Sequence, residues 1–245
     1  MKTHLPDSGP AGFSLVEILV AMTLGVVLLG GALTIYTSSK DGYRLQENIA
    51  GLQENGRFAI QALRRNMEMA GFPLILEIPP FVIGGANGTV DGGGNASDQI
   101  TIQYRSDTDC LGAGTPTNAA APRVAVNRYH IGNGALRCEG NGNPGAPESL
   151  VDNVINMQAL YGIDDDSDGT ANRYVRADQV GTGGVPGWNS VVSLRLALLV
   201  SSDSNINTTQ QAGGFELLDA PAINPGDDRL YRVFTTTIPL RNRIP

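Results

Sequence analysis

The chain has 245 residues and a net charge of -7, with 41% apolar and 17% charged residues. The excess of acidic groups argues against a protein that binds nucleic acid through its phosphates. The 31 glycines and 14 prolines indicate many turns and an all-β or α+β domain.

The first predicted element is a helix that begins at Phe13 and stays apolar as far as Tyr36. About 20 apolar residues in a helix cross the hydrocarbon core of a bilayer, so this stretch is long enough to span one. Glu17 is the only charged residue between Phe13 and Ser39, and an ionised carboxylate at this depth is costly unless it is paired. An ordinary signal anchor explains the length of this stretch but not its glutamate.

The residues Gly12-Phe13-Ser14-Leu15-Val16-Glu17 resemble the processing signature of type IV prepilins. The resemblance implies that a membrane peptidase cuts between Gly12 and Phe13 and methylates the new amino group. It also implies that Glu17 pairs with the terminal amine of a neighbouring subunit while the apolar helices pack. Lys2, in the short leader before the cleavage point, favours a cytoplasmic N-terminus.

The helix is predicted to continue as an amphipathic segment over residues 40–72, because apolar residues recur there at steps of three and four. Gly71 followed by Pro73 predicts where it ends. One helix of about 58 residues would be roughly 85 Å long. We expect its first half to need lipid or neighbouring helices and its second half to pack on its own domain, with glycines such as Gly56 as candidate bend points.

A glycine-rich segment, residues 82–97, comes next. It lacks the GK[ST] sequence and the following helix of a phosphate-binding loop, so it is predicted to be a flexible surface loop. Alternating apolar residues then predict strands, which are expected to pair antiparallel because no helical crossover separates them. The expected strands are residues 99–104, 124–131, 155–163, 192–200 and 230–240.

Two cysteines, Cys110 and Cys138, follow the apolar helix. With a cytoplasmic N-terminus they lie across the membrane, where disulfides persist. Their pairing would close a loop of about 29 residues and stabilise the domain by a few kcal/mol. The alternative is a pair of reduced structural cysteines. Zinc is not expected, because two cysteines without nearby histidines cannot fill a tetrahedral shell.

Three further segments are similar to the PilW family of minor pilins: residues 52–59 in the helix, 192–200 in the late apolar strand, and 232–243 at the C-terminus. The resemblance implies an α+β fold in which a long N-terminal helix packs on a C-terminal antiparallel β-sheet domain. GspJ-type pseudopilins of type II secretion share the processing signal and the helix. The C-terminal run favours the pilus.

A short acidic motif is the best candidate for a metal site. Asp164, Asp166 and Asp168, followed by Gly169, match the start of a calcium-binding loop. The twelfth position of such a loop is Val175, so the bidentate glutamate of an EF-hand is absent. The alternatives are a bound calcium ion and a solvated acidic turn, and no other cofactor is expected.

A catalytic constellation is missing from the sequence. The two histidines are His4 in the leader and His130 in a predicted strand, and no nucleophile elbow accompanies either. Trp188 is expected to serve the core rather than to anchor a partner. The chain is therefore not expected to be an enzyme.

These observations predict a leader at residues 1–12, a transmembrane and polymerisation helix at 13–39, its amphipathic continuation at 40–72 and a periplasmic β-rich domain at 73–245. The expected function is that of a minor pilin, held in the inner membrane and then moved into a pilus whose assembly it helps to start, near the tip. Expected partners are other minor pilins, the major pilin, the prepilin peptidase, the inner-membrane assembly platform and the lipid bilayer. The alternatives are a GspJ-like pseudopilin and a membrane-anchored periplasmic binding protein or enzyme.

Overall fold

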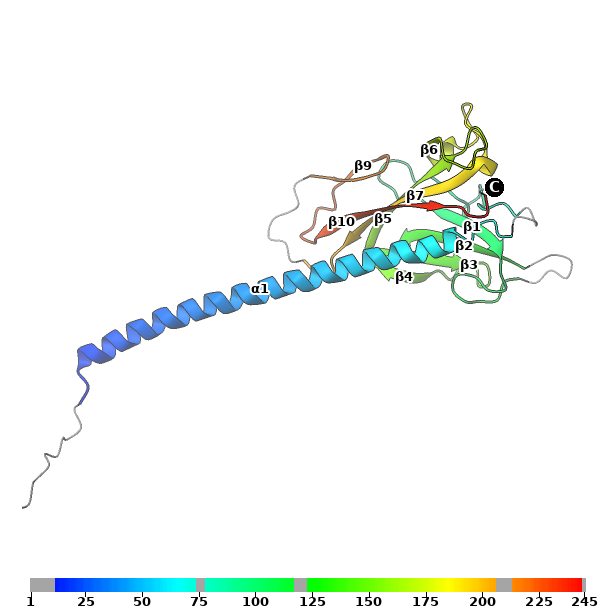
Figure 1. The fold of residues 1–245 in the computed structure, drawn as a ribbon. Coiled ribbons are helices and arrows are strands. Elements are labelled where there is room, and N and C mark those ends of the chain that lie inside the picture. The colour runs from blue at the N-terminus through cyan, green and yellow to red at the C-terminus, as the bar shows by residue number, and fades with distance from the viewer. Residues whose placement is uncertain (1–11, 74–77, 117–122, 206–212, 244–245) are drawn as a thin grey trace, which may run out of the picture. The chain divides into compact units, whose positions relative to one another are not determined.

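The computed structural model describes residues 12–73, 78–116, 123–205 and 213–243. One long helix, α1 (Leu15–Met67), contains 53 residues, a few fewer than the sequence predicts. The chain divides into two compact units, Met1–Gln46 and Glu47–Pro245, so the boundary falls inside α1. The second half of the helix therefore belongs to the same folded unit as the strands (Figure 1).

The end of α1 is set by a close approach of the chain at Gly71. This glycine has a positive φ of 74°, and its N–H donates to the carbonyl oxygen of Gln103 at 2.8 Å. A Cβ atom at this position would lie 3.3 Å from the carbonyl oxygen of Ile78. The predicted stop signal is confirmed, because the conformation and the crowding here both favour glycine.

A first sheet of four antiparallel strands follows in simple meander order. Its β2–β3 turn has Asn133 and Gly134 with φ of 53° and 69°, as a tight hairpin requires. The two strands of the second hairpin, β3 and β4, are not among the predicted strands. The strands are β1 (Ile100–Arg105), β2 (Val124–Gly132), β3 (Ala135–Gly140) and β4 (Glu148–Asp152).

A second antiparallel sheet has the order β10-β7-β5-β6 and contains the three remaining predicted strands, which are confirmed. A separate hairpin of β8 and β9 and two short 3-10 helices complete the described chain. The elements are β5 (Val154–Ile163), β6 (Arg173–Val175), η2 (Ala177–Gln179), η3 (Trp188–Ser190), β7 (Val191–Ser201), β8 (Phe215–Leu217), β9 (Ala220–Ile223) and β10 (Tyr231–Pro239).

The core lies between α1 and the two sheets. The helix contributes Leu52, Ala59, Leu63 and Met67, all buried, which confirms the predicted amphipathic packing. Gly56 is buried on the same face, and a Cβ there would lie 2.2 Å from the Phe234 ring of β10. Helix α1 continues without interruption through Gly56, so this glycine does not end the helix. It allows the Phe234 ring to approach the helix closely.

The central strand β7 is buried on both faces. Leu194, Leu196 and Leu198 face the main core, as the alternation predicts. The other face, with Ala197 and Leu199, forms a second small core that includes residues of the β8–β9 hairpin. Because β7 lies between β10 and β5, both of its edges are paired as well.

Candidate functional site

The N-terminal unit presents an apolar helix surface that nothing in the described chain covers. Leu15, Val27 and Ile35 are each at least 70% exposed. This is the one described helix long and apolar enough to cross a membrane, by length and composition. A surface of this kind is stable only against lipid or other apolar helices.

Glu17 lies in the first turn of α1 and is exposed. A carboxylate there is favoured by the positive end of the helix dipole. Gly12 and Phe13 precede the helix in non-helical backbone, and Phe13 is 78% exposed. The Gly12–Phe13 bond is thus outside the helix, where a peptidase could reach it. The leader residues Lys2 and His4 lie outside the described part of the chain.

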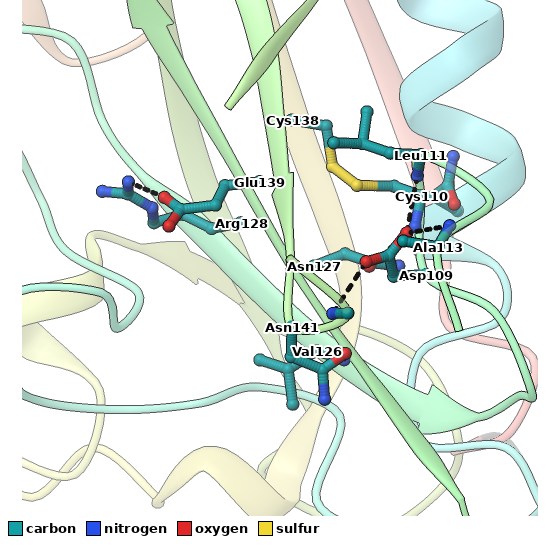
Figure 2. The surroundings of a disulfide bond; sticks show 12 residues. Asp109, Cys110, Leu111, Ala113, Val126, Asn127, Arg128, Cys138, Glu139 and Asn141 are labelled. Atoms are coloured by element: carbon teal, nitrogen blue, oxygen red, sulfur yellow. Dashed lines mark hydrogen bonds and ion pairs between the residues drawn. A yellow bond between two sulfur atoms is a disulfide. The ribbon is translucent and has the colours of Figure 1, made fainter. Parts of the chain in front are cut away.

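The two cysteines form a disulfide bond in the second unit. Cys110, in the loop after β1, is joined to Cys138 of β3, with their Cα atoms 6.6 Å apart (Figure 2). Asn127 of β2 fixes the loop end, because its side-chain oxygen accepts the N–H of Cys110 at 2.9 Å. The alternative of two reduced cysteines is not what the structure contains.

Asp109, next to this disulfide, orders the loop that carries Cys110. One carboxylate oxygen accepts the N–H groups of Leu111 and Ala113 at 2.9 and 3.0 Å, and the other accepts that of Gly142 at 2.9 Å (Figure 2). A Cβ at Gly140 would lie 2.0 Å from the Asp109 carboxylate. A buried carboxylate therefore holds the loop against the end of β3. This contact joins residues about 30 positions apart, so no local sequence pattern predicts it.

An ion pair between Arg128 and Glu139 links β2 and β3 on the same sheet (Figure 2). Glu139 also accepts the N–H of Gly145 at 2.6 Å. Burial raises the pKa of Glu139, but these two partners outweigh it and hold the pKa below its ordinary value. Burial, followed by the positive charge of Arg128, lowers the pKa of His130. His130 has no described nucleophile beside it and is a strand residue.

The acidic motif forms a turn after β5. The carboxylates of Asp164, Asp166 and Asp168 can place one oxygen each within 4.8 Å of one another. Asp164 already accepts three backbone N–H bonds, from Asp166, Ser167 and Gly169, at 2.6 to 3.2 Å. Burial raises the pKa of Asp164, but these donors leave it below its ordinary value. Asp164 therefore stabilises the turn itself, and calcium binding stays a prediction.

The glycine-rich segment is held against the sheet more firmly than a flexible surface loop would be. Its end lies along the free edge of β5: the N–H of Asp98 donates to the carbonyl of Met157 at 2.8 Å, and the N–H of Ala159 donates to the Asp98 carboxylate at 2.7 Å. Asn156 and Gln158 donate to the carbonyls of residues 95 and 96. These bonds take the place of a neighbouring strand.

Asp98 is the one strongly perturbed carboxyl in this loop. It is 3% exposed, and its second oxygen accepts the N–H of Gly92 at 2.8 Å. Burial raises its pKa to about 7, against these hydrogen bonds, and the nearby carboxylates of Asp91 and Asp219 raise it further. Trp188 packs close by on Tyr161 and Phe81, at ring distances of 4.8 and 5.3 Å, which agrees with its predicted core role.

The predicted functional residues thus fall in separate places. Gly12, Phe13 and Glu17 belong to the first unit, whereas the disulfide and the acidic turn belong to the second. No described cavity brings a nucleophile, a base and an acid together. What the first unit offers is a helix that is apolar as far as Ser39 except for Glu17, a surface suited to packing.

Comparison with protein families gives two matches, one in each unit. Residues 8–33 match the prokaryotic N-terminal methylation motif, a range that contains Gly12, Phe13 and Glu17. Residues 123–242 match the family described as type IV pilus-assembly protein W, PilW. Together the two matches support a type IV pilin-like minor pilin of the PilW family. That family and its fold are structural rather than enzymatic.

One solved structure supports this fold. A type IV-like pilin from Thermus thermophilus is similar with a TM-score of 0.50 and 16% identity, over 79% of this chain and 98% of that one. The GspK–GspI–GspJ complex of the type 2 secretion system of enterotoxigenic Escherichia coli gives a TM-score of 0.36 and 11% identity, over 76% and 96%. At that score the second similarity adds nothing to the assignment. No curated protein sequence matches the chain.

Proposed function

We propose that this PilW-family chain is a minor pilin that helps to start assembly of a type IV pilus and remains near its tip. The main support is the exposed apolar stretch of α1 as far as Ser39, which has Glu17 as its single charge and begins shortly after the Gly12–Phe13 bond. Before assembly the helix holds the chain in the inner membrane, and the domain from Glu47 onward lies in the periplasm. The disulfide bond supports that placement, because disulfides persist there.

Assembly requires the apolar helix to leave lipid for a bundle of similar helices. The apolar side chains contact other apolar groups both in lipid and in the bundle, so burying them hardly favours the bundle. The polar groups therefore make the contribution that favours specific packing of the helices. Cleavage after Gly12 would create an amine on Phe13, and the Glu17 carboxylate of one subunit would pair with the amine of the next. The partners are therefore other minor pilins and the major pilin, after the prepilin peptidase has acted at the assembly platform.

Deleting the gene tests the role in the pilus. We expect the yield of sheared surface pili to fall strongly and to return when the wild-type chain is supplied. Normal pili would contradict the proposal and would favour a pseudopilin of type II secretion. Measuring secreted proteins in the same strains separates these two outcomes.

Substitution of Glu17 tests the proposed mechanism. Glu17→Ala should leave cleavage after Gly12 intact but reduce incorporation into sheared pili, because the neighbour's amine loses its partner. Glu17→Asp, which keeps the charge, is the matched control and should incorporate better than Glu17→Ala. Equal incorporation of all three chains would rule out the pairing.

A further inference from the structure

A groove of about 770 Å³ lies beside the second half of α1, between the helix and the end of β4 with the turn after β7. It is lined by four carboxylates: Glu47, Glu54, Asp152 and Asp203. The described residues that line it include no lysine or arginine. The groove is therefore strongly anionic, and a phosphate-bearing ligand or an anionic lipid would be repelled from it.

The groove also has an aromatic surface. Phe58 of α1 lines it and is 56% exposed, although the neighbouring helix positions Leu52 and Ala59 are buried. An exposed phenyl ring among carboxylates suits an arginine, whose guanidinium group binds carboxylate oxygens and stacks on an aromatic face. The expected occupant is thus a segment that carries arginine.

Such a segment lies on the other flank of the same helix. Arg57 of α1 and Arg232 of β10 line a shallow surface hollow there, and both are exposed. The Arg232 guanidinium carbon lies 5.6 Å from the ring centroid of Phe234, so a planar cation is already presented beside an aromatic ring. Neither arginine forms an ion pair within the described ranges of the chain.

We propose that the carboxylate groove of one copy of this chain receives the Arg57–Arg232 flank of a second copy. The groove is lined by four carboxylates and the flank by two arginines, and the two adjoin along α1, since Glu54 lines both. Because each copy presents both surfaces, two copies can make the contact reciprocally, with the groove of each receiving the flank of the other. This contact goes beyond the role in starting assembly and does not depend on it.

The test is a charge-exchange series in the full chain, made in a host membrane that contains no other pilin. Two copies with different tags are produced together and purified through one tag in mild detergent at low salt. Asp152→Lys reverses the groove and Arg232→Glu reverses the flank. We expect each alone to reduce recovery of the second copy about tenfold, because an attraction becomes a repulsion.

The chain that carries both reversals is the decisive variant, because every contact then joins a reversed groove to a reversed flank. Its recovery should return to within about twofold of the wild type. Glu216→Lys, an equal charge change at an exposed position of β8 outside both surfaces, is the control and should leave recovery unchanged. Salt near 1 M should weaken the wild-type association, because exposed charges are then screened.

Three results would overturn the proposal. Equal recovery of all variants would mean that the apolar N-terminal helices alone hold the copies together. Loss in both single variants without return in the double variant, when Trp188 fluorescence shows the domain folded, would mean that the two surfaces do not meet. Absence of any association in the wild type would show that a second copy is not the occupant. Loss of pili on gene deletion is a separate measurement, so the two proposals can fail independently.

Discussion

Asp98 makes the domain's stability depend on pH in a direction opposite to that of most carboxylates. Its pKa is about 7 in the folded domain, against an ordinary value of 3.8. A raised pKa means that its contribution is fully present below about pH 4 and is lost as the pH rises through 7. Ionisation of Asp98 lowers the free energy of unfolding by about 4 kcal/mol over the whole range from acid to alkaline pH. About 2–3 kcal/mol of this decrease falls between pH 5 and pH 8.

The perturbation is Asp98→Asn, and the assay is urea unfolding of the full chain in detergent at pH 5, 6, 7 and 8. Trp188 is the only tryptophan and packs on Tyr161, so its fluorescence follows unfolding of the domain. The asparagine cannot ionise. It also offers one acceptor oxygen where the aspartate offers two, so the variant should be less stable at pH 5 but should lose the fall in stability toward pH 8.

The difference between wild type and variant reports Asp98 together with Asp91, whose raised pKa is coupled to it through a side-chain hydrogen bond. His130 has a lowered pKa, so its contribution is present above pH 6.5 and declines as the pH falls, but it is the same in both chains. Carboxyls with lowered pKa, such as Asp164 and Glu139, lose their contribution only as the pH falls below their ordinary values near 4. If the variant kept the wild-type decrease from pH 5 to pH 8, the reasoning about Asp98 would be wrong.

Three further outcomes are expected. Replacing both cysteines by serine should lower the free energy of unfolding by about 3–4 kcal/mol, measured by Trp fluorescence in urea, because the closed loop of about 29 residues is released; an unchanged midpoint would contradict this. Calcium should bind the 164–168 turn with a Kd of about 10⁻⁴ to 10⁻³ M in calorimetry. Asp166→Asn should abolish the heat, and no heat at millimolar calcium in the wild type would exclude the site. Gly56→Leu should cost about 1–3 kcal/mol by overpacking, whereas Gly51→Ala, with open space around it, should be neutral or stabilising by up to about 1 kcal/mol.

Periodic patterns in the sequence were sufficient to predict the elements that bury one regular face. The steps of three and four in α1 and the alternation in β7 both correspond to buried faces, as predicted. The hairpin of β3 and β4 was not predicted because Ala135–Gly140 mixes charged, small and apolar residues and shows no alternation. The residues of β3 are buried by the elements that pack on both sides of the strand. The Asn133–Gly134 dipeptide was the available signal for that hairpin.

The polar contacts of the domain could not be predicted, because each joins residues that are far apart in the chain. Asp98 meets Ala159, and Asp109 meets Gly142, through folding of the whole domain. An aspartate next to glycines is typical of a turn, and nothing local distinguishes one that is buried from one that is solvated. The glycine-rich segment is predicted to be a flexible surface loop from its composition, which does not show the distant hydrogen bonds that hold it.

The bonds between that segment and β5 have a consequence for crowded conditions. A sheet edge with open N–H and C=O groups can pair with the same edge of another molecule and begin aggregation. Along β5, Ser97 and Asp98 occupy the backbone groups of Met157 and the N–H of Ala159, and β6 pairs with Tyr161, Gly162 and Ile163. The middle and the end of this strand are therefore less open to edge-to-edge pairing when domains are crowded together.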